Sequence, residues 1–148
     1  MSKIQKVLVT GKTHTTGSDA RIFSGDHEGN LNIKLTGTGA RTHVFEAIQA
    51  HPTAEQLFAG AWSACYSAAV GIVAKEKNVT LPADTAVDIE VDLGLGGGEY
   101  FLQARITLIA LGIDEEVALA IAHGADQMCP YSKATRGNID VTLNVITA

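Results

Sequence analysis

Two cysteines, Cys65 and Cys129, are the residues of this chain best suited to covalent chemistry. A cysteine reacts as its thiolate, and at an unperturbed pKa of about 8.5 only roughly 3% of a thiol is ionised at pH 7. Lowering that pKa to about 6 makes roughly 90% of the thiol reactive. The pair could therefore supply reactive thiols, provided that some other group lowers the pKa of one of them.

Two other roles fit the same cysteines. Each could be a small buried hydrophobe in a helix, which is a frequent state of an isolated cysteine. The two could also form a structural disulfide, since closing the loop between positions 65 and 129 would add about 4 kcal/mol in the chain-entropy model. Composition and periodicity do not choose among the three roles.

The residues around Cys65 set a condition on its reactivity. Cys65 lies among Ala, Trp and Tyr, where desolvation alone raises the pKa of a thiol. A reactive Cys65 therefore needs a cation from elsewhere in the fold. Arginine suits this role because it stays charged when buried, and a carboxylate is then needed to hold the arginine.

Composition excludes several classes of function. The chain has 148 residues, 46% of them apolar and 18% charged, which predicts a single domain over residues 1–148 with a sizeable core. A net charge of −5 argues against nucleic acid as a partner, because phosphate binding needs a cationic face. The five histidines show no metal-ligand spacing, so we expect neither a metal nor a cofactor.

Two sequence features concern location and membranes. The opening residues, MSKIQKVLVT, carry no apolar segment after their lysines, so we expect no secretory signal and a cytoplasmic location. The longest apolar stretch, residues 57–74, is interrupted by Ser63, Cys65, Tyr66 and Ser67. This stretch is predicted to be a buried helix and not a membrane span.

The element that must position Cys65 is this central helix. Thr53 and Gln56 have the spacing of a capping box, so the helix is predicted to start there and to run to about Glu76. It is apolar on nearly every face, which is typical of a helix in the middle of a core. A second helix, capped by Asp114, is predicted to end at Cys129, followed by one more turn that Gly137 stops.

Alternating apolar residues predict the strands. These cover residues 4–10, 31–35, 87–93, 100–110 and 139–145. Turns are predicted at 15–19, 25–29 and 94–98, and a short helix is one reading of residues 43–49. The glycine run at 94–98 lacks a following helix and a P-loop lysine, so it is a weak candidate for nucleotide binding. The order of elements predicts an α+β fold.

Two segments carry a family resemblance. Residues 54–65, AEQLFAGAWSAC, resemble the helix motif around the reactive cysteine of the OsmC/Ohr family. Residues 129–141, CPYSKATRGNIDV, are similar to the second-cysteine signature of the Ohr branch, the organic hydroperoxide resistance proteins. The resemblance extends over LPAD at 81–84 and the closing strand. It implies the OsmC/Ohr-like fold, with antiparallel sheets around a long buried central helix, in an intertwined homodimer.

The resemblance also implies an activity. Such a protein is a thiol peroxidase in which Cys65 attacks an organic hydroperoxide and becomes a sulfenic acid, releasing an alcohol. Cys129 then condenses with it to a disulfide, which a cellular dithiol, typically a lipoylated protein, reduces by exchange. Phe58 and Trp62 could help to line an apolar pocket, although core packing is the favoured role of Trp62.

The family site also uses a glutamate and an arginine. Glu55 matches the glutamate, but ten residues of one helix separate it from Cys65 by about 15 Å. We therefore expect Glu55 to act through the arginine or in the partner's site. The arginine departs from the pattern: Ser18 occupies its usual position, and Arg21 is our prediction for the role. Arg41 and Arg136 are the alternatives. Ala54 and Lys133 replace the usual proline and asparagine.

Two rival functions remain. One is an OsmC-like relative with a different peroxide preference, against which the Ohr-type sequence at 131–138 argues. The other is a non-catalytic dimeric binding module that keeps the fold but has lost catalysis with the loop arginine. A module of the second kind would show no reactive thiol near neutral pH.

Overall fold

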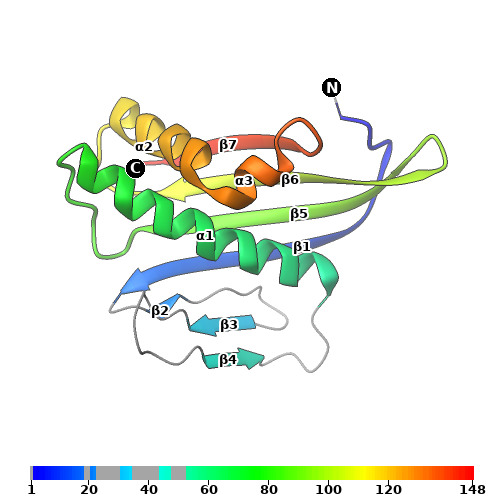
Figure 1. Cartoon of the computed structure of the whole chain (residues 1–148), viewed down its shortest axis with the longest axis horizontal. Coiled ribbons are helices and arrows are strands. Elements are labelled where there is room, and N and C mark those ends of the chain that lie inside the picture. The colour runs from blue at the N-terminus through cyan, green and yellow to red at the C-terminus, as the bar shows by residue number, and fades with distance from the viewer. Residues whose placement is uncertain (1, 19–20, 23–30, 35–43, 48–52) are drawn as a thin grey trace.

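The computed structural model describes residues 2–18, 21–22, 31–34, 44–47 and 53–148. In this part of the chain three helices cover one face of a five-stranded sheet of order β2-β1-β5-β6-β7, an α+β arrangement (Figure 1). The sheet strands are β1 (Lys6–Ser18), β2 (Arg21–Ile22), β5 (Ala86–Gly96), β6 (Glu99–Ile109) and β7 (Asp140–Ile146). The helices are α1 (Ala54–Glu76), α2 (Glu115–Met128) and α3 (Pro130–Thr135).

Strand β1 is longer than its sequence pattern predicts. It continues through residues expected to turn, and it pairs with β5 as far as Thr16. Thr13 and Thr15 are buried, and the Thr13 hydroxyl donates to the Ile89 carbonyl at 3.0 Å. Threonine is β-branched and fits a strand, so the partner strand decides the outcome where polarity alone suggested a loop.

The hairpin of β5 and β6 confirms the two predicted strands but shortens the turn between them. Only Gly97 and Gly98 stand between the strands, with φ of 58° and 85°. A two-residue turn of this kind requires positive φ, which glycine adopts without strain. The inward side chains of the hairpin build the core against the helices: Val87, Ile89, Val91, Ala104, Ile106 and Leu108.

Two strands contradict the expectations. β7 pairs in parallel with β6, so the sheet is mixed and not wholly antiparallel. The cause is the α2–α3 connection, which crosses the sheet and returns the chain to the starting end of β6. The segment considered as a short helix contains β4 (Val44–Ala47), which pairs with β3 (Leu31–Lys34) in a separate two-stranded sheet. That pairing is a tertiary contact, which overrides a weak local helical pattern.

Helix α1 begins at the predicted capping box, which is confirmed. The Thr53 hydroxyl accepts from the Gln56 backbone N–H, and the Gln56 side chain accepts from the Thr53 N–H. By length and composition this helix could cross a membrane, but 56% of its most apolar segment is buried in the protein. That burial agrees with its interpretation as a core helix.

Helix α1 is less completely buried than predicted, because only one of its faces packs against the sheet and α2. Trp62, Tyr66 and Val70 on that face are almost inaccessible. The opposite face, called here the open face of α1, leaves apolar side chains exposed in this chain. It consists of Leu57, Phe58, Ala61, Ala68 and Ile72.

Candidate functional site

The two cysteines meet at the boundary between the buried side and the open face of α1. Cys65 lies in the middle of α1, and Cys129 occupies the junction between α2 and α3. Both are free thiols, and their Sγ atoms are 2.8 Å apart. Cys65 is half-buried, whereas Cys129 is fully buried. The pair can form a disulfide, and only Cys65 is open to a molecule from outside.

The sequence around Cys129 explains how this thiol is presented. Helix α2 starts at Asp114, whose carboxylate accepts from two backbone N–H groups, as predicted for a cap. It ends where the Cys129 N–H donates to the Ala125 carbonyl at 2.8 Å, because the extended Cys129 backbone stops the helix. Pro130 opens α3, and Gly137 follows its end with φ of 80°. The corner therefore holds Cys129 between two helices.

Two buried hydrogen bonds connect α1 to the helices that carry Cys129. The Trp62 indole donates to the Ser132 hydroxyl on α3 at 3.0 Å. The Tyr66 hydroxyl donates to the Ala122 carbonyl on α2 at 2.7 Å. Burial raises the pKa of the Tyr66 phenol, so it remains protonated as a donor. Trp62 is buried, in agreement with its expected packing role.

The surroundings of Cys65 disfavour its thiolate. Burial, followed by the hydrogen bond with Cys129, raises the pKa of Cys65 to about 11, while the backbone N–H of Tyr131 acts in the opposite direction. This confirms that desolvation raises the pKa of Cys65. Within the described residues, no cation is among the groups that shift this pKa.

Of the three candidate arginines, Arg136 is the one whose side chain the structure describes. Arg136 donates to the carbonyl and the carboxylate of Asp126 on α2, and it is not among the groups that shift the pKa of Cys65. The backbone of Arg21 pairs with that of Ser18. The predicted arginine therefore lies next to the residue that occupies the family's usual arginine position. The Arg21 side chain and the whole of Arg41 lie outside the described part. Arg21 therefore stays a prediction.

Glu55 lies in the first turn of α1, which also carries Cys65 without interruption. The ten-residue separation of about 15 Å along the axis thus applies within this chain. Gly11 of β1 supports this end of the helix from beneath. A Cβ on Gly11 would approach the backbone of Glu55 and Gln56 to 2.5 Å, so glycine is required there. Glu55 and Cys65 do not share one small site in a single chain.

A second concentration of polar groups lies on the far face of the sheet, the face opposite the helices. The Arg105 guanidinium donates to both carboxylate oxygens of Asp92, at 2.7 and 2.9 Å, and its Nε donates to Glu90 at 2.9 Å. The Asp92 side chain is 3% exposed and also accepts from Thr10 and Gln103. Arg105 holds the pKa of Asp92 well below its usual range.

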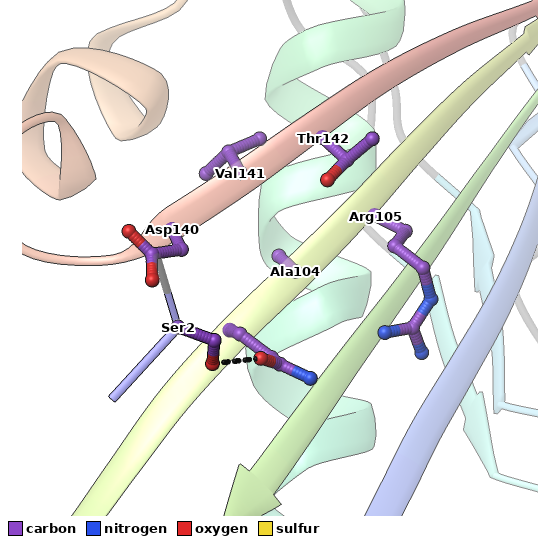
Figure 2. A pocket seen from close by; sticks show the side chains of 7 residues that line it. Ser2, Ala104, Arg105, Asp140, Val141 and Thr142 are labelled. Carbon is purple, nitrogen blue, oxygen red and sulfur yellow. Dashed lines mark hydrogen bonds between the residues drawn. The ribbon is translucent and has the colours of Figure 1, made fainter. Parts of the chain in front are cut away.

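A hollow of about 390 Å³ adjoins this cluster (Figure 2). It is lined by Ser2, Gln103, Ala104, Arg105, Asp140, Val141 and Thr142. Figure 2 views it with α1 behind the strands, and neither cysteine lines it. Among its described lining residues the cation is Arg105, which is already paired with two carboxylates, so we assign the hollow no chemistry.

Two residues that join the helices around the cysteines escape sequence reasoning. Ser132 and Tyr66 have no local signal, because the partners of their hydroxyls lie 70 and 56 residues away. Among the residues that the structure describes, no three His, Cys, Asp or Glu side chains gather closely enough to hold a metal ion.

Comparison with known proteins places the chain in a family. Residues 28–144 match the family described as OsmC-like protein. The organic hydroperoxide resistance protein of Xanthomonas axonopodis pv. citri is 34% identical, over 98% of this chain and 99% of its own length. The corresponding protein OhrB of Bacillus subtilis is 30% identical, over 93% of this chain and 98% of its own.

Solved structures agree with the sequence relatives. The crystal structure of Bacillus subtilis OhrB superimposes with a TM-score of 0.60 at 29% identity, covering 94% of this chain and 98% of that one. An organic hydroperoxide resistance protein from Elizabethkingia anophelis gives 0.59 at 28% identity, covering 98% and 100%. These matches extend over the α+β fold, the long helix and the segments of both cysteines. The chain belongs to the OsmC/Ohr family.

Proposed function

We propose that this protein is a cysteine-based peroxidase that reduces organic hydroperoxides to alcohols. The observation that carries the proposal is the 2.8 Å separation of the Cys65 and Cys129 sulfurs. Relatives named organic hydroperoxide resistance proteins support the substrate class. Two thiols at this distance close a disulfide with little movement, since a disulfide bond is about 2.05 Å long.

The unequal burial of the thiols supports a division of labour. The half-buried Cys65 attacks the peroxide: its thiolate bonds to one peroxide oxygen, the O–O bond breaks, and the leaving alkoxide takes a proton to become an alcohol. The fully buried Cys129 then attacks the Cys65 sulfenic acid. An S–S bond forms, the S–O bond breaks, and water leaves. A dithiol, on the family's pattern a lipoylated protein, reduces the disulfide by exchange.

The raised pKa of Cys65 means that a cation must complete the site. Arg21 is our candidate, positioned by Glu55 of the same chain or of a partner. The pairing of β2 with the end of β1 brings the Arg21 backbone beside Ser18, the position at which the family carries its arginine. An arginine there would favour the thiolate over the thiol.

We extend the proposal to a homodimer built on the open face of α1. Leu57, Phe58 and Ile72 expose apolar side chains on one stripe of this helix, and a second copy would bury them. The size of the particle in solution, measured by light scattering, tests this point. A mass of one chain at micromolar concentration would contradict it.

The test of the activity is stopped-flow oxidation of the reduced protein by cumene hydroperoxide and, separately, by hydrogen peroxide. Free thiols are counted before and after. We expect rapid loss of both thiols of each chain, faster with the organic peroxide. Slow and non-selective loss would contradict the proposal, and a preference for hydrogen peroxide would favour an OsmC-like relative of different specificity.

One observation favours a second candidate, a non-catalytic dimeric binding module. The pKa of Cys65 is raised to about 11, which leaves almost no thiolate at neutral pH unless a cation acts on it. The pH dependence of thiol alkylation separates the two functions. A module gives no reactive thiol near pH 7, whereas a peroxidase gives one.

A further inference from the structure

The hydrogen bond between Trp62 and Ser132 joins the helix of the attacking cysteine to the helix that follows the second cysteine. Donor and acceptor are 3.0 Å apart. Trp62 is 1% exposed and Ser132 is 2% exposed, so water does not compete for either group. A buried polar pair of this kind contributes most when the alternative is to leave both groups without a partner.

The register of this bond matches that of the two sulfurs. Trp62 precedes Cys65 by three residues on α1, and Ser132 follows Cys129 by three residues on α3. Three residues of helix rise about 4.5 Å, so the hydrogen bond lies about one turn from the sulfur pair. Because the order of the partners is reversed, α1 and α3 pass each other in opposite directions at this crossing.

Apart from this hydrogen bond and the exposed Arg136–Asp126 contact with α2, α3 buries few side chains. The helix has six residues, and its buried side chains are Ser132 and Thr135, both polar. The Thr135 hydroxyl donates to the Ser132 carbonyl inside α3 itself, so this hydrogen bond does not tie α3 to α1. Little apolar surface of α3 is therefore buried, and the docking of this helix depends on its polar contacts.

We propose that the Trp62–Ser132 hydrogen bond keeps α3 docked on α1, which makes Trp62 and Ser132 positioning residues for closure of the Cys65–Cys129 disulfide. The inference deepens the proposed function and rests on it for the peroxide step. The Cys129 sulfur must reach the Cys65 sulfur as the S–S bond replaces the S–O bond and water departs. When α3 is docked in a smaller fraction of the chains, the effective concentration of one sulfur at the other is lower.

The first test does not use peroxide. The equilibrium between the dithiol and disulfide forms is measured in mixtures of reduced and oxidised dithiothreitol for the wild type, Ser132→Ala, Trp62→Phe and the double variant. Each single variant should lower the disulfide equilibrium constant about tenfold, which corresponds to about 30 mV. The double variant should lose little more than either single variant, because the two residues act through one bond.

Tyr66→Phe is the matched control. It removes a buried hydroxyl donor from the next residue position after Cys65, but the acceptor of that donor belongs to α2 and not to α3. Like Ser132→Ala and Trp62→Phe, this variant should lose thermal stability, but it should keep the wild-type disulfide equilibrium constant. Wild-type disulfide equilibrium constants in Ser132→Ala and Trp62→Phe would overturn the inference. The same tenfold loss in Tyr66→Phe would also overturn it.

The second test uses cumene hydroperoxide and traps the sulfenic acid with dimedone. In Ser132→Ala and Trp62→Phe the rate of disulfide closure, measured separately from the rate of the first oxidation, should fall about tenfold, and trapping of the sulfenic acid should increase. If peroxide does not oxidise the wild-type protein, the proposed function is overturned but this inference is not. The dithiothreitol equilibrium still decides the role of the Trp62–Ser132 hydrogen bond. Unchanged rates of disulfide closure in both variants would contradict a positioning role for the Trp62–Ser132 hydrogen bond.

Discussion

The two faces of the central sheet treat reactive groups in opposite ways. On the far face, every strong charge that the structure describes in the Arg105 cluster has a partner, and the buried Asp92 carboxylate accepts from three side chains. On the helix side, the Cys65 thiol has a hydrogen bond with another thiol and a pKa raised by burial. The far-face arrangement stabilises the Asp92 carboxylate, whereas the arrangement on the helix side destabilises the Cys65 thiolate.

This difference separates structure from function. A charged cluster whose members satisfy one another is held in one state, so Asp92 and Arg105 gain nothing from a ligand. A thiol pair at 2.8 Å with one half-buried member can change its covalent state by forming a disulfide. Perturbed pKa values occur at both places, and the raised pKa of Cys65 by itself argues against reactivity. The short distance between the two sulfurs and the remaining exposure of Cys65 are what support the proposed reaction.

The largest expected effect comes from exchanging one thiol of the pair. Cys65→Ser should abolish turnover of organic hydroperoxide, because it removes the attacking atom. Cys129→Ser should allow one oxidation per chain and then stop at the sulfenic acid. Peroxide consumption and the mass of the oxidised protein measure both. Full activity in Cys65→Ser would exclude the mechanism.

The next effect should come from the cation. If Arg21 activates Cys65, Arg21→Ala should move the apparent pKa of Cys65 toward about 11, the value that the described surroundings impose. The thiolate fraction at pH 7, and with it the oxidation rate, should then fall by at least about a hundredfold. Rates of thiol alkylation as a function of pH measure the shift. Arg41→Ala is the control, and a shift in that variant instead would reassign the role.

Breaking the far-face cluster should affect stability and leave the thiols alone. Arg105→Leu removes the main partner of a buried carboxylate and should lower the free energy of unfolding by about 2 kcal/mol, less than for a fully buried pair since Arg105 is partly exposed. Urea denaturation measures the loss. Lys12→Met, at an exposed ion pair with Glu90, is the control and should change stability by less than about 0.5 kcal/mol. Loss of peroxidase activity in folded Arg105→Leu would contradict this separation of the two faces.

The smallest effect should appear at acid pH. The pKa of Asp92 is lower in the folded state than in the unfolded state, so unfolding takes up a proton. The resulting stability is present above the unfolded pKa of about 3.9 and is lost as the pH falls from about 5 toward the folded pKa. In Asp92→Asn the free energy of unfolding should therefore depend less on pH below about 5. An unchanged slope in denaturation series from pH 6 to about 3 would argue that other carboxylates cause it.

Local sequence patterns predicted much of the fold. The capping box at Thr53 and the Asp114 cap mark helix starts because they depend on residues three or fewer positions apart. The alternating residues of β5 and β6 predict strands because side chains of a strand point to opposite faces. The two cysteine segments carried the family resemblance, which the comparisons confirmed.

Contacts between distant residues were decided by the tertiary structure alone. The parallel pairing of β7, the full length of β1 and the open face of α1 all depend on which elements pack together. The same holds for the approach of Cys65 to Cys129 and for the Trp62–Ser132 bond, whose partners are 64 and 70 residues apart. Local periodicity reports which side of an element is apolar, but not what covers that side. The sequence by itself therefore predicted most of the elements and the two candidate thiols, and packing decided which thiol faces outward.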